Sequence, residues 1–393
     1  MKSFLLFTAI FLTQAAFAQL KITGRIVDNE TRLPLPFVHI FSDEIGTISN
    51  EDGEFQLTLK RNGMTVLFSH VGYERTSIFF DKEIDTLVKL KISPVLLAEI
   101  VVDGNNIKSI IRNAYNKLIE SSLDARFSCF YRQTTKNDKL YSELFEMFYK
   151  ADISPAGVSK WKVHQGRYAE RTVFEQEGYI GHQNFSIFTK RLPLALQEPR
   201  SYIVPLIHNT EDYYEFELKE KRKAQDTILY YISFVPKPAC PYPGFKGTLV
   251  IDDHYNVHRF SGELKDPRFR PLDESVMKKT SNLILQIDIH CDIKIKGHRL
   301  PSMIRNQLAY DYQAAKRKVR KVKSESVFIV LSPENDTLNL EDSTPENDFQ
   351  TINNLHYDEA FWEANETIKY TPLDKELIRQ FKSIKGFTRT FQK

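Results

Sequence analysis

Residues 22–41 read ITGRIVDNETRLPLPFVHIF and residues 46–59 read GTISNEDGEFQLTL, and these two stretches decide the fold of the first part of the chain. In the second stretch, Phe55, Leu57 and Leu59 alternate with polar residues, which is the period-two pattern of a half-buried strand. The run Asn-Glu-Asp-Gly just before this strand is typical of a tight turn. The pattern therefore predicts short β-strands joined by turns.

The same pattern continues outward from these stretches to residue 102. Seven apolar runs are expected to form strands: residues 22–26, 37–40, 55–59, 66–68, 78–80, 87–90 and 100–102. Short strands at roughly ten-residue spacing indicate a β-sandwich of two sheets. We therefore predict a seven-stranded N-terminal sandwich over residues 20–103.

Further landmarks are FSHVGYE at residues 68–74 and LAEIVVDG at residues 97–104. Together with the two stretches above, they resemble the carboxypeptidase regulatory-like domain, a transthyretin-like sandwich common in envelope proteins of Bacteroidota. In that family the module accompanies peptidases or precedes outer-membrane receptors. The resemblance covers about residues 20–103 and implies a non-catalytic adaptor.

The first residues resemble a secretory signal. Lys2 supplies a positive start, residues 4–12 are apolar, and Ala-Phe-Ala at residues 16–18 is a small-x-small cleavage pattern. We therefore predict a signal peptide over residues 1–18, cleaved between Ala18 and Gln19. The mature protein is expected in the periplasm or associated with the outer membrane, without a transmembrane segment.

Composition excludes several classes of function. The 54 basic and 51 acidic residues nearly cancel, for a net charge of +3, so nucleic acid is not an expected partner. Cys129, Cys240 and Cys291 lie far apart in the sequence and show no zinc-type spacing. We expect buried free thiols, and the alternative is a single disulfide with one thiol left over.

The hydrophobic period changes after Gly104. Apolar residues from Ile107 to Ile119 recur at helical spacing, which predicts an amphipathic helix over residues 105–122. Strand-like segments follow up to residue 331, such as residues 127–133, 140–148, 228–235, 248–252, 257–264, 283–295 and 326–331. An irregular or helical insertion is expected at residues 192–198. Residues 104–331 are therefore predicted to form a helix plus a large curved antiparallel sheet, so the fold class is mainly β, with an α+β second part. We expect aromatic residues such as Phe148 and Tyr149 to pack between the sheet and this helix.

The C-terminal part, residues 332–393, differs in composition. Residues 332–355 are polar and predict a loose connector, and two short helices are expected at residues 358–368 and 373–384. The phrase YDEAFWEANETIKYTPLDKELIRQF at residues 357–381, with SIIRNAYNKL at residues 109–118, weakly resembles a second Bacteroidota envelope family of unknown function. Members of that family carry the same sandwich and a C-terminal outer-membrane barrel, and we expect this chain to be without the barrel.

Catalytic motifs are weak. His208 and Glu211 match the HxxE half of a zinc carboxypeptidase, with His254, His258, His290 and His298 as formal third ligands. The spacing is unspecific, and we interpret these histidines as ordinary surface or sheet residues. Residues 252–254, Asp-Asp-His, are expected to form a hairpin turn. We therefore predict no catalytic residue, no metal and no cofactor.

One cationic run is a candidate binding patch. It contains six cations: Lys316, Arg317, Lys318, Arg320, Lys321 and Lys323. These charges would attract an anionic envelope polymer, such as a lipid phosphate or an anionic glycan. The alternative, which we favour, is a sheet edge or hairpin whose charges keep it soluble.

Three functions follow, in order of preference. The first is a non-catalytic envelope adaptor, which binds an envelope protein or outer-membrane component through the sandwich and the β-rich domain. The second is a carrier that holds a lipid or acyl chain in a half-barrel formed by the middle domain. The third is a zinc carboxypeptidase-like enzyme.

Overall fold

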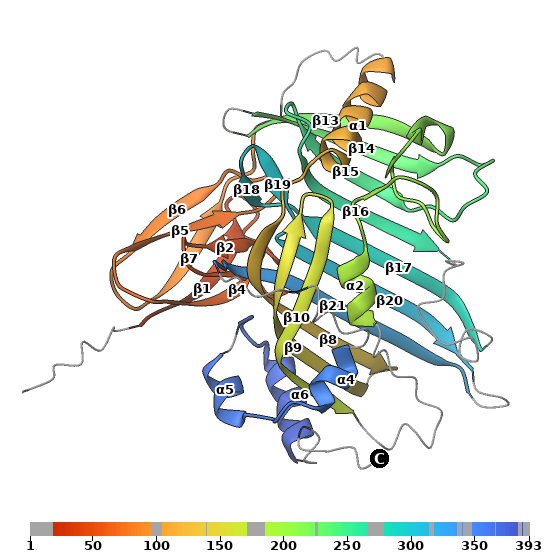
Figure 1. Cartoon of the computed structure of the whole chain (residues 1–393). Helices are drawn as coiled ribbons and strands as arrows, with labels where there is room; N and C mark the ends of the chain where they lie inside the picture. The colour runs from red at the N-terminus through yellow and green to blue at the C-terminus, as the bar shows by residue number, and fades with distance from the viewer. Residues whose placement is uncertain are drawn as a thin grey trace, which may run out of the picture.

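A computed structural model describes residues 19–95, 104–138, 140–170, 185–224, 227–265, 279–313, 318–335, 340, 348–365, 367–383 and 387. The predicted signal peptide and Ala18 lie outside the described residues. The chain forms a small sandwich, one large sheet and a group of short C-terminal helices (Figure 1). The predicted mainly-β fold class is confirmed.

The N-terminal sandwich contains two sheets, in the strand orders β4-β1-β7 and β3-β2-β5-β6. Its strands are β1 (Leu20–Asp28), β2 (His39–Phe41), β3 (Gly46–Ile48), β4 (Glu54–Leu59), β5 (Met64–Ser69), β6 (Thr76–Phe80) and β7 (Ile84–Leu90). Six of the seven expected strands are present. The expected strand at residues 100–102 lies outside the described residues, and the three-residue strand β3 was not predicted.

A glycine allows the strands of the sandwich to approach closely. β1 pairs parallel with β7, and Gly24 lies opposite Thr86. A Cβ atom on Gly24 would lie 2.2 Å from the Thr86 carbonyl oxygen and 2.8 Å from the Phe55 ring. Only glycine fits there, because any side chain would collide with the neighbouring backbone. Phe55 can therefore be fully buried in the core of the sandwich.

The large sheet contains ten antiparallel strands in the order β10-β9-β8-β21-β20-β17-β16-β15-β14-β13. They are β8 (Ala125–Asn137), β9 (Leu140–Ser154), β10 (Gly157–Glu170), β13 (Tyr214–Ala224), β14 (Thr227–Pro236), β15 (Lys246–Asp252), β16 (Val257–Lys265), β17 (Thr280–His290), β20 (Met303–Tyr312) and β21 (Arg320–Pro333). The predicted run 283–295 is divided, because the chain leaves the sheet after His290 and forms the small hairpin β18 (Ile293–Ile295) and β19 (His298–Leu300). The expected large antiparallel sheet is confirmed.

One face of the sheet, here called the inner face, packs against α1 (Gly104–Ile119) and α2 (Phe185–Arg191) (Figure 1). The predicted helix is present and ends three residues earlier than expected. The insertion at 192–198 was expected to be irregular or helical. Most of it is irregular, and its two residues β11 (Ala195–Leu196) pair parallel with β12 (Leu206–Ile207). A 3-10 turn, η2 (Thr210–Asp212), follows.

The opposite face, here called the outer face, carries the sandwich and the two helices that follow residue 358. Side chains alternate along each strand, so Tyr149 points to the inner face and its neighbour Phe148 to the outer face. Phe148 packs against Trp362, with ring centroids 5.5 Å apart. The prediction that Phe148 packs against the first helix was therefore wrong.

In the C-terminal part that the structure describes, the helices are α4 (Asp348–Asn353), α5 (Glu359–Ala364) and α6 (Pro372–Ser383). The last two were predicted. α4 lies within the segment that was expected to be a loose connector, and its residues Asp348 and Ile352 are buried. This helix was not predicted because the segment is mostly polar and buries only one large apolar side chain, Ile352. In the described residues, no helix is both long and apolar enough to cross a membrane.

Candidate functional site

The sandwich is held against the outer face by contacts that come from distant parts of the chain. Ser69 donates a hydrogen bond of 3.1 Å to Asp292, which follows the sheet strand β17. At a second place, Asn50 donates a bond of 3.3 Å to the backbone oxygen of Lys369, in the C-terminal segment. Thr47 likewise donates to the backbone oxygen of Thr367. The docked side of the sandwich is therefore held at two places.

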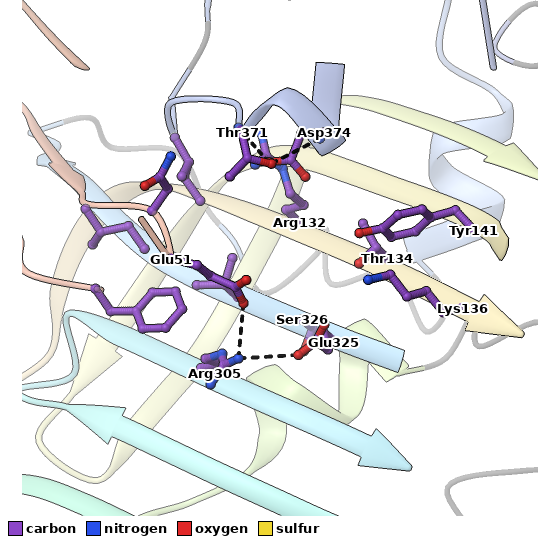
Figure 2. Close-up of a pocket in the computed structure, with 15 residues that line it drawn as sticks. Glu51, Arg132, Thr134, Lys136, Tyr141, Arg305, Glu325, Ser326, Thr371 and Asp374 are labelled. Atoms are coloured by element: carbon purple, nitrogen blue, oxygen red, sulfur yellow. Dashed lines mark hydrogen bonds and ion pairs between the residues drawn. The ribbon is translucent and has the colours of Figure 1, made fainter. Parts of the chain in front are cut away.

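A cavity of about 150 Å³ lies where the sandwich, the sheet and the C-terminal segment meet (Figure 2). Its apolar wall includes Phe37 and Ile368. Charged side chains in the wall are Glu51, Arg132, Lys136, Arg305, Glu325 and Asp374. Arg305 joins the sandwich to the sheet, since its guanidinium lies 3.6 Å from Glu51 and 3.3 Å from Glu325. The charges in this wall balance, which suits a joint between parts of the chain.

Arg132 belongs to a buried charge network beneath this cavity. The Glu146 carboxylate accepts hydrogen bonds of 2.6 Å from Nε of Arg132 and from Nε of Arg167. Burial alone would raise the pKa of Glu146, but the two guanidinium groups outweigh burial and lower it. Arg167 also donates a bond of 2.9 Å to the Tyr370 hydroxyl. The network therefore attaches the segment before α6 to the sheet.

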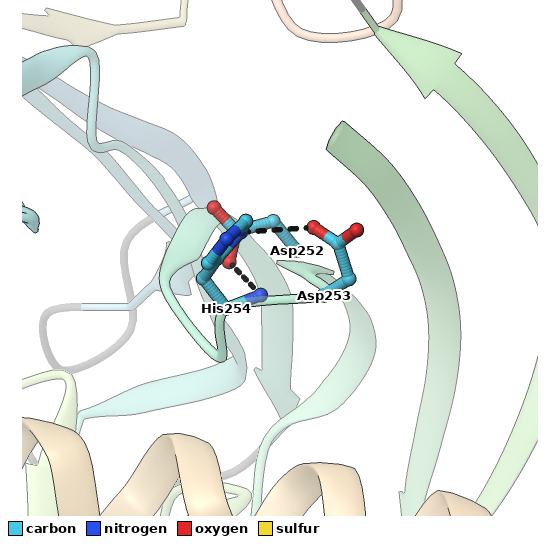
Figure 3. A group of neighbouring side chains, drawn as sticks. All are labelled: Asp252, Asp253 and His254. Atoms are coloured by element: carbon cyan, nitrogen blue, oxygen red, sulfur yellow. Dashed lines mark hydrogen bonds and ion pairs between the residues drawn. The ribbon is translucent and has the colours of Figure 1, made fainter. Parts of the chain in front are cut away.

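The predicted turn at residues 252–254 is confirmed: it joins the antiparallel strands β15 and β16 (Figure 3). Potential metal-ligand atoms of Asp252, Asp253 and His254 lie within 4.8 Å of one another. However, Oδ1 of Asp252 accepts the backbone N–H groups of His254 and Asn256, at 3.0 and 2.8 Å, and Oδ2 pairs with His258 at 3.0 Å. Burial would raise the pKa of Asp252, but these hydrogen bonds lower it. The aspartate oxygens are thus used to form the turn.

The HxxE candidate residues do not converge. His208 is exposed, and Glu211 forms an ion pair of 2.7 Å with Arg112 of α1. Among the described residues, His208 belongs to no group of three potential ligands. Of the four formal third ligands, His258 pairs with Asp252, and His290 lies 3.2 Å from Asp288.

The cationic run lies at the start of β21. Lys316 and Arg317 are outside the described residues; Lys318 and Lys321 are exposed, and Arg320 and Lys323 are half-buried. β21 lies between β8 and β20 in the middle of the sheet, so the predicted sheet edge was wrong, while the predicted hairpin is present as β20–β21. The physical reason is that both neighbours pair along the charged end: Lys323 lies opposite Lys136 and Ala309. Its charge is partly compensated, since Lys323 lies 2.8 Å from Glu325.

The thiols and the inner face can also be placed. All three cysteines are free; Cys129 and Cys291 are buried, and Cys240 is half-buried. The inner face is filled by apolar side chains of α1 and of the segment after α2, such as Ile111 and Leu194. This part of the described sheet is therefore a packed core, which does not support an acyl-chain carrier.

Sequence reasoning missed one group of residues that the structure brings together. Arg75, Lys117, Lys294 and Arg299 line one cavity, and only the last two are neighbours in the sequence. The four cations come from three distant segments, so no single stretch of sequence shows the group.

Comparisons with known proteins agree with this picture for one part of the chain. Residues 22–102 match the model of the CarboxypepD_reg-like domain family. A solved structure from Bacteroides fragilis NCTC 9343, provisionally described as a membrane-associated protein of unknown function, aligns with 80% of this chain and 98% of its own. Its sequence identity is 9% and its TM-score is 0.16. No curated protein matches the chain. The N-terminal sandwich of this protein is therefore a CarboxypepD_reg-like domain.

Proposed function

We propose that the chain is a non-catalytic adaptor of the cell envelope, which binds a partner protein through the free side of its N-terminal sandwich. The observation that carries this proposal is the exposure of three large apolar side chains on the strands β6 and β7. Phe79 is 64% exposed, Leu87 is 55% exposed and Ile84 is 40% exposed. Exposed apolar side chains on strands that end a sheet are features that a partner protein can cover.

The position of these residues favours a partner protein over contacts within the chain. β6 and β7 each lie at the end of their sheet, so within the described residues each has one backbone edge without a neighbouring strand. Both strands lie on the far side of the sandwich from β21 (Figure 1). The side that carries His39 and Ser69 already contacts the large sheet. One side thus holds the rest of the chain while the other is available to a partner.

Three further observations support a non-catalytic envelope role. The CarboxypepD_reg-like domain is a regulatory, non-catalytic domain. Burial raises the pKa of the Cys129 and Cys291 thiols, which makes both poor nucleophiles. For the envelope, the support is the signal-like pattern of residues 1–18.

The test is site-specific photo-crosslinking in intact cells. A photoreactive amino acid replaces Phe79 in one strain and Val235 in a control strain; Val235 is 45% exposed but lies on β14 of the large sheet. We expect one crosslinked envelope protein of defined mass from position 79 and none from position 235. The double substitution Phe79→Ser with Leu87→Ser should abolish association with that protein. The proposal fails if position 79 gives no product, or the same products as position 235.

A further inference from the structure

A second cavity, of about 420 Å³, lies on the other side of the joint between sandwich and sheet. Four cationic side chains line it: Arg75 just before β6, Lys117 in the last turn of α1, Lys294 in β18 and Arg299 in β19. The turn drawn in Figure 3 forms another wall, and α1 passes beneath it in that view. The Lys117 ammonium donates a hydrogen bond of 2.9 Å to the His254 backbone oxygen, which fixes α1 against the turn.

These four cations have no carboxylate partner. Among the described residues, none of them is within salt-bridge distance of an acidic side chain. Lys117 and Arg299 donate instead to backbone oxygens, Arg299 to that of Cys291 at 3.0 Å. By contrast, the half-buried Arg259 of β16 forms an ion pair of 2.7 Å with Asp288.

The acids at this site do not neutralise the four cations. Among the described residues, Asp252 is the only acid that lines the cavity, and the buried Asp292 acts on Arg75 and Arg299 from behind the wall. The Asp252 oxygens already accept hydrogen bonds from the turn backbone and from the Asn256 amide, and one of them pairs with His258. In the described part of the chain, four cations therefore face two carboxylates, and the one in the wall has its hydrogen-bonding positions occupied.

The mutual repulsion of the cations also affects their protonation. Burial lowers the pKa of Lys117, and nearby Lys294 lowers it further, although Asp252 opposes this effect. Burial likewise lowers the pKa of Arg299, and Arg75 adds to the decrease. Bringing like charges together in a partly desolvated site costs free energy, which an anion between them would recover.

We propose that this cavity binds a phosphate group. A phosphate carries up to two negative charges and several acceptor oxygens, so it matches a ring of four donors better than a single carboxylate does. The volume exceeds that of one phosphate group, which leaves room for the rest of a phosphorylated molecule. The phosphate belongs either to a soluble molecule or to a membrane lipid, and both share the chemistry that these residues recognise. The site is separate from the proposed partner surface on β6 and β7.

The test uses the purified mature chain and isothermal titration calorimetry in low-salt buffer, because salt screens such interactions. The probes are pyrophosphate, vesicles of phosphatidic acid in phosphatidylcholine, and vesicles of phosphatidylcholine alone. Binding of pyrophosphate alone identifies a soluble phosphate; binding of phosphatidic acid vesicles alone identifies a lipid phosphate; binding of both identifies the phosphate group itself. The proposal is overturned if neither phosphate probe binds more tightly than sodium chloride or phosphatidylcholine vesicles.

Charge reversal locates the site. Lys294→Glu should weaken binding by about tenfold or more, since it removes an attraction and adds a repulsion. Lys117→Glu is the second variant. Lys162→Glu, at an exposed position on β10, is the matched control with the same change in net charge. Thermal unfolding verifies that each variant is folded. If the wild type and both folded cavity variants bind phosphate with equal affinity, the location is refuted. The Phe79→Ser, Leu87→Ser variant should bind phosphate like the wild type, even if the adaptor proposal fails.

Discussion

The rings of His70 and His290 meet edge to face, with centroids 5.8 Å apart, across the joint between sandwich and sheet. His70 follows β5, and His290 is the last residue of β17. His39 lies close to the same charges, since Asp292 and His290 both influence its protonation. Burial lowers the pKa of His39 and of His70 from 6.5 to about 4 in each case. Both side chains therefore stay neutral while the sandwich is docked.

Acid should weaken this joint in a defined pH window. The histidines bind protons near pH 6.5 when exposed but only near pH 4 when docked, so stability is full above pH 6.5 and decreases as the pH falls towards 4. Asp288 and Asp292 have lowered pKa values as well, but protonation of these two aspartates destabilises the protein only below their ordinary pKa of 3.8. The measurement is the melting temperature as a function of pH. His70→Gln should flatten the decrease between pH 6.5 and 4, while His254→Gln, at an exposed position, should leave it unchanged.

The buried pair Lys190 and Asp348 should be important for stability. Both side chains are fully buried, and Asp348 also accepts hydrogen bonds from Trp161 at 3.0 Å and from Ser186 at 2.8 Å. Asp348→Asn leaves the Lys190 charge without a partner and should cost about 3 to 5 kcal/mol in urea denaturation. The double variant with Lys190→Met should recover part of this loss.

An exposed ion pair provides the comparison for this prediction. The Lys382 ammonium lies 2.8 Å from Glu359 on the surface of the C-terminal helices. Lys382→Met should change stability by less than about 1 kcal/mol. A similar cost for Asp348→Asn would show that α4 is not packed as described.

Gly166 of β10 should be required for the docking of α4. A Cβ atom at this position would lie 2.3 Å from Cγ1 of Ile352. Gly166→Ala should therefore destabilise the protein by about 1 to 3 kcal/mol and speed hydrogen exchange in α4. In a double variant with Ile352→Ala, the alanine methyl group has space. The double variant should then lose less stability than the two single variants lose together. Equal losses would contradict the contact.

The three thiols should react at different rates. Cys240 is half-buried in a loop, whereas Cys129 and Cys291 are buried and burial raises their pKa values. Treatment of the native protein with iodoacetamide, followed by mass spectrometry, should label Cys240 first. Rapid labelling of Cys129 would mean that the inner face opens in solution. A disulfide between any two of these cysteines would be equally contrary to the structure.

The sequence predicts the regular strands well and the distorted ones poorly. The alternation from Phe55 to Leu59 is strict, and β4 lies where it was expected. β10 was not predicted, although Trp161 and Val163 alternate with lysines, because the strand contains bulges near Ser159 and His164. Each bulge shifts the alternation by one residue, so the period-two signal is lost.

The candidate sites depend on contacts between distant segments. The cations from 316 to 323 are contiguous in the sequence and were noticed, but the structure partly pairs them. Arg75 and Arg299 are far apart in the sequence and meet only because the sandwich docks beside the β18–β19 hairpin. Exposed Phe79 was predicted only as a strand residue, since alternation does not reveal which face of an edge strand is covered.

The pairing of β8 with β21 determines when the protein can fold. Thr135 and Ser324 lie opposite one another at the centre of the sheet, and their hydroxyl groups are 3.1 Å apart. β8 is the first strand of the sheet in the sequence and β21 is the last. Synthesis must therefore reach about residue 333 before the two strands can pair along their length. Until then, β8 and its neighbours expose an unpaired edge, a state in which a nascent chain needs protection from aggregation.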